Sequence, residues 1–300
     1  IAALIVSPVY FYLFFKCQDD FSVKSIMKVL VFCVRFAAFY GVVLFLYKTI
    51  TGVFFDIPGV TTTYGAEKGL EERMNNRGEL FKLISTYNNG NMYAVCMIML
   101  ATLYRVLESS KLWFCVFLLS VVLTLSRSAW ILLFIYFFLE FFLLNRTLRL
   151  SRLLILFVST FVLLLLGVKL LNLIGRDISF VFDSNLGGRA TYLQNLFEAG
   201  FISEQKISWS YEIPYVSFAQ FVGAFSIPFY LLYFFSLVLN AKSLIGGRAP
   251  LKRGAALGVL LYFFATFADA ALILVPTSYI FFFLVFFSLS EFSYGNLSRS

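Results

Sequence analysis

The surroundings of Arg127 suggest a functional role for its charge. It lies in the apolar run 112–144, in which the only other charged residue is Glu140. A charge at the depth of lipid is costly, usually turns toward protein or an aqueous cavity, and often serves function. The alternative is an arginine that snorkels to the outer headgroups while its aliphatic stem stays in lipid. Position alone leaves both interpretations open.

Arg189 belongs to the stretch "GGRATYLQNLFEAGF" at 187–201, in which apolar residues of 192–197 share one helical face. The two glycines allow the backbone to turn before this helix, so Arg189 lies in its first turn. Unpaired backbone N–H groups and the helix dipole favour an anion there, and a guanidinium offers two parallel donors to a phosphate. The alternative is a solvated loop arginine.

Glu212 directly precedes an apolar helix, and Pro214 lies near that helix's first turn. The carboxylate could act as a general base at the membrane surface, where it would accept a proton from a substrate. It could also be an acidic first-turn residue that complements the helix dipole. The residue type alone favours the second interpretation.

The elements that would position these residues are transmembrane helices. Of the 300 residues, 61% are hydrophobic and 13% are charged, whereas soluble domains carry about 25% charged residues. The apolar runs are continuous and long enough for crossings of about 20 residues each, and in lipid such runs form helices. The composition therefore predicts an all-α polytopic transmembrane helical bundle, with 1–300 as a single membrane domain.

Nine helices are expected along the chain, together with two larger polar loops at 48–90 and 172–215. The chain begins inside an apolar run and without Met, which indicates that N-terminal sequence is missing. The expected helices span 1–15, 26–47, 91–107, 109–125, 128–144, 153–171, 216–239, 254–268 and 277–291.

The distribution of Lys and Arg predicts the topology. A single helix over 112–144 would be about 50 Å long, more than one bilayer. With a turn at 126–128, four short segments share one side and hold three, two, three and four Lys or Arg. These segments are 16–28, 105–111, 145–152 and 241–253. Since cytoplasmic loops carry the excess of positive charge, both large loops and Arg127 are expected to be extracytoplasmic.

Several classes of chemistry are excluded by what the sequence lacks. The chain has no histidine, so His bases, Ser–His triads and His-bound metals are ruled out. The four cysteines match neither a metal-binding nor a disulfide pattern, and there is no glycine-rich phosphate loop. No metal and no cofactor are therefore expected. The net charge of +8 is mainly an orientation signal, so no nucleic acid partner is implied.

Two further charges have uncertain roles. Arg35 lies near the middle of the expected helix 26–47, where a charge needs a substrate or a structural partner that the sequence does not name. Asp269 lies at an expected outer helix end and could face the same cavity as Arg127.

Three stretches, in this order, resemble the O-antigen polymerase and O-antigen ligase superfamily of bacterial envelope glycans. They are "NNGNMYAVCMIML" at 88–100, "LTLSRSAWILLFIYFFLE" at 123–140, and "GRATYL" at 188–193 followed by the aromatic "PYVSFAQFVGAFS". The third carries an arginine and a leucine four residues apart. The resemblance covers about residues 80–290, and all three motifs are expected on the same outer side.

The resemblance implies a multi-pass enzyme of the bacterial cytoplasmic membrane that works on the outer face. It would transfer a growing glycan from undecaprenyl pyrophosphate to a hydroxyl of a lipid-linked repeat unit. Arg127 and Arg189 would stabilise the departing pyrophosphate, and Glu212 would be the base. The expected substrate-binding residues are Arg127, Arg189, Arg176, Trp209, Tyr211, Tyr215 and Asn91. The expected partners are lipid-linked oligosaccharides, membrane lipid, a flippase and chain-length regulator proteins.

One departure from the family's pattern favours a polymerase over a ligase. The ligases carry a His in a "HNSYLxxLxExG"-like stretch, where this chain has "EIPYVSFAQFVG" and Glu212. The remaining alternatives are an O-antigen ligase, a lipid-linked oligosaccharide flippase and a purely structural membrane subunit. A transporter would bind near the bilayer midplane, often between repeated halves, and the sequence contains no internal repeat.

Overall fold

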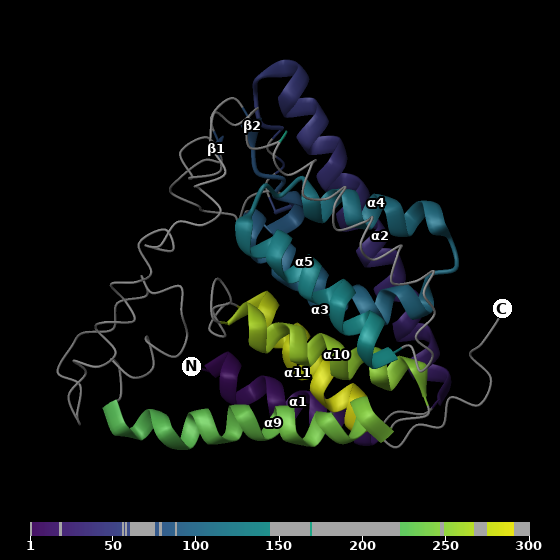
Figure 1. Cartoon of the computed structure of the whole chain (residues 1–300), viewed down its shortest axis with the longest axis vertical. Helices are drawn as coiled ribbons and strands as arrows, with labels where there is room; N and C mark the ends of the chain where they lie inside the picture. The colour runs from purple at the N-terminus through teal and green to yellow at the C-terminus, as the bar shows by residue number, and fades with distance from the viewer. Residues whose placement is uncertain are drawn as a thin grey trace.

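The computed structural model describes residues 2–17, 20–55, 57, 59–60, 76–77, 80–87, 89–144, 169, 223–246, 249–266 and 275–290. This part of the chain is mostly helical (Figure 1), which confirms the all-α expectation. Its helices are α1 (Ala2–Cys17), α2 (Asp20–Thr51), α3 (Gly90–Leu107), α4 (Lys111–Val122), α5 (Arg127–Leu139), α9 (Ser226–Gly246), α10 (Pro250–Ala265) and α11 (Val275–Leu289). The expected helix at 153–171 falls almost entirely outside these ranges, so the predicted number of helices is not tested.

Only short elements accompany these helices in the described ranges. The strands β1 (Asn76–Arg77) and β2 (Leu80–Phe81) form one antiparallel pair. Single 3₁₀ turns cover Ser85–Tyr87 and Gly223–Phe225, and a π-helical turn, Glu140–Leu144, extends α5.

Three helices in the described ranges are long and apolar enough to cross a membrane, namely Val23–Thr51, Gly90–Leu107 and Ser226–Ile245. Two shorter apolar helices cover Lys111–Val122 and Pro276–Leu289. Large apolar side chains are exposed along α2 and α9, including Phe32 and Val238. Apolar surface of this extent is typical of a face that contacts lipid or another protein.

The run 112–144 is broken into two helices, as the charge distribution predicted. α4 ends at Val122, and the backbone of Leu125 has a positive φ of 50° before α5 begins at Arg127. This conformation is uncommon for a leucine and reverses the chain. The indole N–H of Trp130 donates to the carbonyl of Val122 at 3.1 Å and holds the two helix ends together. The turn lies at 123–126, slightly earlier than the predicted 126–128.

Helix α3 is the centre of the described bundle and packs mainly on α10, with α5 and α11 also against it. The closest approach occurs at Gly258, where a Cβ atom would lie 2.2 Å from the carbonyl oxygen of Met99. A Cβ at Gly254 would lie 3.2 Å from the backbone nitrogen of Leu103. Small residues four apart allow such close helix contact in membranes. The sequence analysis missed this signal in "GAALG".

Two expected cytoplasmic segments, 105–111 and 241–253, lie at the end of the bundle where α5 and its π-helical turn end. Arg105, at the end of α3, forms an ion pair with Glu140 at 2.6 Å. Arg253, at the start of α10, donates to the carbonyl of Leu143, and Lys252 donates to that of Ser290. At the opposite end of α3, the amide of Leu83 donates to the carbonyl of Leu123 at 3.1 Å, beside the α4–α5 turn. The expected segment 145–152 lies outside the described residues, and the face of the membrane on which each end lies stays a prediction.

Several helix boundaries differ from expectation, and α9 for example ends at Gly246 rather than at residue 239. α2 runs from Asp20 to Thr51, well beyond 26–47, so the loop expected from residue 48 begins later. α10 starts at Pro250 rather than at residue 254, because a proline is well tolerated at the first helical position, where no helical N–H is needed.

Candidate functional site

The structure places only part of the predicted site. Arg127 and Asn91 belong to the described residues, and they lie at the first turns of α5 and α3. The prediction that Arg127 and Arg189 converge on one outward-facing cavity therefore stays untested. The residues that lie outside the described ranges are Arg176, Arg189, Trp209, Tyr211, Glu212, Tyr215 and Asp269.

Arg127 is the first residue of α5 and is half-buried. The preceding Ser126 makes no capping hydrogen bond to the helix, because its hydroxyl lies 2.9 Å from that of Ser128. The first N–H groups of any α-helix lack partners within the helix, and they carry a partial positive charge. A cation in this place is unfavourable for the helix itself. An anionic ligand would relieve the repulsion and use the same N–H groups.

Asn91 lies in the first turn of α3. The side chain of Asn89 caps this helix by accepting from the amide of Asn91 at 2.9 Å. The Asn91 side-chain oxygen accepts a hydrogen bond from Nζ of Lys82 at 2.9 Å. The Lys82 residue is only 5% exposed, although lysine is rarely buried to this degree. Sequence reasoning missed Lys82, and its only signal was a lysine inside the apolar "LFKLI".

The segment 81–87 joins these residues to the turn before Arg127. Its residues Phe81, Leu83 and Ile84 are buried, and the hydroxyl of Ser85 donates to the carbonyl of Ala37 in α2 at 2.6 Å. The amide of Leu83 reaches the α4–α5 turn, as described above. The segment thus brings Lys82 and Asn91 to the end of the bundle where α5 begins. That end combines the cationic side chains of Lys82 and Arg127, and of Lys48 over the ring of Phe81, with the N-termini of two helices. Positive charge and free backbone N–H groups are suited to a phosphate-bearing ligand.

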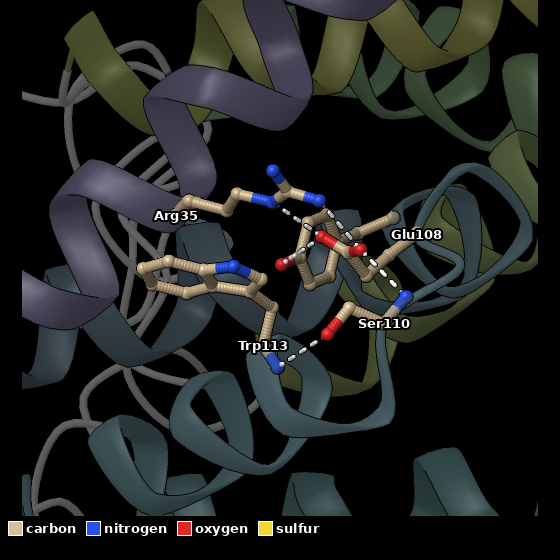
Figure 2. Close-up of polar contacts among 5 residues, drawn as sticks. Arg35, Glu108, Ser110 and Trp113 are labelled. Atoms are coloured by element: carbon tan, nitrogen blue, oxygen red, sulfur yellow. Dashed lines mark hydrogen bonds and ion pairs between the residues drawn. The ribbon is translucent and has the colours of Figure 1, made fainter.

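Arg35 has a structural partner that the sequence analysis did not name, the carboxylate of Glu108 (Figure 2). The Arg35 Nε and Nη2 atoms donate to the two carboxylate oxygens at 2.6 and 2.7 Å. The hydroxyl of Tyr104 and the amide of Ser110 donate to the same carboxylate at 2.9 and 2.8 Å. The guanidinium also lies over the ring of Trp113, 5.4 Å from its centroid.

The environment of Glu108 makes it a poor proton acceptor. The hydrogen bonds from Arg35 hold the pKa of Glu108 below its ordinary value, and the bond from the Ser110 amide acts in the same direction, against the effect of burial. A carboxylate with four donors has little capacity left for a substrate. We therefore assign this cluster a structural role, which is to fix α2 to the connection between α3 and α4.

Within the described residues, no group of three or more Cys, Asp or Glu side chains could hold a metal ion. No protein-family model matches the chain, and searches of curated proteins and of solved structures found no similar protein.

Proposed function

We propose that this protein is a polysaccharide polymerase that extends a glycan on the outer face of a bacterial cytoplasmic membrane. Its donor would be a growing chain on undecaprenyl pyrophosphate, and its acceptor a lipid-linked repeat unit. The observation that most supports this is the cationic end of the bundle, where Arg127 heads α5 close to the turn that contacts Leu83. A pyrophosphate leaving group requires positive charge in that kind of place.

The reaction needs one bond to form and one to break. The acceptor hydroxyl oxygen attacks the anomeric carbon of the donor glycan, and the bond from that carbon to the pyrophosphate oxygen breaks. The hydroxyl proton passes to a base, for which Glu212 is the proposed residue. Undecaprenyl pyrophosphate leaves with one more negative charge, which Arg127 and Arg189 stabilise. No metal is needed to balance this step.

The position of Arg127 favours an enzyme over a transporter. Transporter sites lie near the bilayer midplane, commonly at broken helices. Arg127 lies at a helix start at one end of the bundle. Arg35 lies within a candidate membrane span, and its guanidinium is paired with the carboxylate of Glu108.

The test is deletion of the gene in its native strain, followed by gel analysis of surface polysaccharide. A polymerase predicts that the ladder of long chains collapses to single repeat units and returns with the wild-type gene. Complete loss of repeat units from the lipid A core would instead indicate a ligase. A third assay reconstitutes the protein in liposomes and measures flipping of a labelled lipid-linked repeat. If the wild-type protein flips the repeat and the Arg127→Gln variant does not, the protein is a flippase.

A further inference from the structure

Cationic side chains from three helices meet at the start of α4. The guanidinium of Arg35, from α2, lies 5.4 Å from the ring centroid of Trp113. The guanidinium of Arg105, in the last turn of α3, lies 5.5 Å from the ring centroid of Phe114, the next residue of α4. Lys111 is the first residue of α4 and is exposed. The first turn of α4 is therefore flanked by positive charge.

Both arginines belong to ion pairs in which the carboxylate lies inside and the guanidinium outside. The side chain of Glu108 is 0% exposed, whereas that of Arg35 is 36% exposed. In the second pair, 12% of the Glu140 side chain is exposed and 49% of that of Arg105. Figure 2 shows one guanidinium nitrogen of Arg35 pointing away from Glu108. A guanidinium has five N–H donors, so it can hold its carboxylate and still donate outward. The outer surface is therefore cationic although each arginine is paired.

The exposed face of α2 extends this cationic surface and adds apolar side chains to it. Lys28 precedes Arg35 by seven residues, or two helical turns, so the two lie on the same face, and Lys28 is exposed. Phe32, between them, is 68% exposed, and Leu112, next to Lys111, is 71% exposed. Lysine and arginine beside exposed large apolar side chains suit a ligand with an anionic head and an apolar body.

An apolar track leads away from this surface along α2. The rings of Phe32 and Phe36 stack at 6.5 Å, and those of Phe36 and Tyr40 at 5.5 Å. Exposed apolar side chains continue along α2 as far as Ile50. From Arg35 to Ile50 the helix rises about 22 Å, more than the ~15 Å of half a bilayer core. A track of this length suits the acyl chains of a lipid and gives no advantage to a soluble anion.

We propose that the cationic surface formed by Lys28, Arg35, Arg105 and Lys111 binds the headgroup phosphate of an anionic membrane phospholipid, whose acyl chains lie along α2. Phosphatidylglycerol has the required net negative charge, whereas phosphatidylcholine is neutral overall. Basic pockets between membrane helices bind anionic headgroups in this way. The inference is independent of the reaction proposed above, because none of these four residues belongs to the proposed catalytic site.

Quenching of tryptophan fluorescence by brominated lipids tests this proposal. Trp113 is half-buried at the proposed site, and the chain has three tryptophans. The quenching that disappears in a matched Trp113→Phe protein therefore reports lipid beside this residue. The protein is reconstituted in mixtures of phosphatidylglycerol and phosphatidylcholine, one of them brominated in its acyl chains, which gives the relative binding constant of the two lipids. We expect a preference for phosphatidylglycerol of about fivefold or more, since each Lys or Arg near a membrane surface contributes about that factor.

Charge-removing and charge-keeping variants of the two exposed lysines locate the site. In Lys28→Gln/Lys111→Gln the preference should fall to within about twofold of unity. Lys28→Arg/Lys111→Arg is the matched control, and it should keep the preference of wild type. If the glutamine double variant does not fold, the two single variants and wild type in 1 M NaCl replace it. Raising the salt from 0.1 M shortens the Debye length from about 10 Å to about 3 Å, so the preference should again decrease.

Four outcomes would overturn the proposal. The first is a wild-type protein without a preference for phosphatidylglycerol, and the second is an unchanged preference after the charges are removed or screened. The third is an equal loss in the glutamine and arginine variants, which would show that charge does not set the preference. The fourth is displacement of phosphatidylglycerol by inorganic phosphate at matched ionic strength, which would show a site for a free anion.

Discussion

The first residue of α5 is a poor place for a positive charge if helix stability is the only requirement. An arginine there faces the positive end of the helix dipole, and Ser126 contributes no side-chain cap. The helix dipole gives no reason for an arginine at this position, whereas the proposed function does. Activity and stability should therefore respond in opposite directions when this residue is changed.

Arg127→Gln tests that separation. We expect glycan transfer to fall about 10²-fold or more, as when a single donor to a developing negative charge is removed. The melting temperature should stay the same or rise, because the unfavourable interaction with the dipole is worth about 0.3–1 kcal/mol. Arg127→Lys should recover only part of the activity, since lysine lacks the planar fork. Loss of folded protein in the membrane fraction would contradict the functional explanation.

The ion pair of Arg35 with Glu108 should contribute to the stability of the protein rather than to glycan transfer. Arg35→Met leaves a buried carboxylate with two of its four donors, which should cost about 1–3 kcal/mol. The Arg35 side chain is itself 36% exposed, so solvent screens part of the interaction. Thermal unfolding of the two single variants and the double variant Arg35→Met/Glu108→Gln measures the coupling between them. Additive effects would contradict the assigned role.

The lowered pKa of Glu108 gives that pair a pH dependence of defined sign. A carboxylate whose pKa is lower in the folded state contributes its full stabilisation above the ordinary value of 4.5. The contribution disappears as the pH falls through the lower folded value. The difference in melting temperature between wild type and Glu108→Gln should therefore be constant near neutral pH and shrink below about pH 4.5. A difference that grows on acidification would show that the carboxylate is not stabilised by Arg35.

At the scale of elements, the helices were largely predictable because long apolar runs leave the backbone no alternative in lipid. The break before Arg127 was predictable from charge balance, but its mechanism was not. It depends on the left-handed backbone of Leu125 and on the bond from Trp130 to Val122, and neither has a sequence signal. The burial of segment 81–87 was also missed, because its short apolar run stands inside a polar loop.

The contact between α3 and α10 depends on two glycines, and graded substitution tests it. Gly258→Ala places a Cβ atom 2.2 Å from a backbone oxygen, so the helices must move apart and the protein should lose about 1–3 kcal/mol. Gly254→Ala meets the backbone at 3.2 Å and should cost less. Thermal unfolding in detergent or nanodiscs measures both. If Gly254→Ala were the more damaging change, the described packing of α10 would be wrong.

For the molecule as a whole, the positions of the candidate residues were easier to predict than their contacts. Arg127 and Asn91 were identified from their places at helix ends, and both are found there. Lys82 was missed because a lysine in a polar loop is normally solvated, and only the fold of that loop buries it. Arg35 was recognised as needing a partner, but Glu108 is 73 residues away and no local pattern links them.

The last prediction concerns the orientation of the whole bundle. α3 separates the end with Leu83 from the end with Arg105, and at 1.5 Å per residue its 18 residues span about 27 Å, close to the thickness of the bilayer core. Reporter fusions at Gly59 and at Asn145 should consequently report opposite sides, with Asn145 in the cytoplasm because the basic segments favour that side. A fusion at Ala249 should agree with Asn145, since Arg253 and Leu143 are in contact. If Gly59 and Asn145 reported the same side, Arg127 would not face the lipid-linked donor and the proposed reaction would have no site at this end.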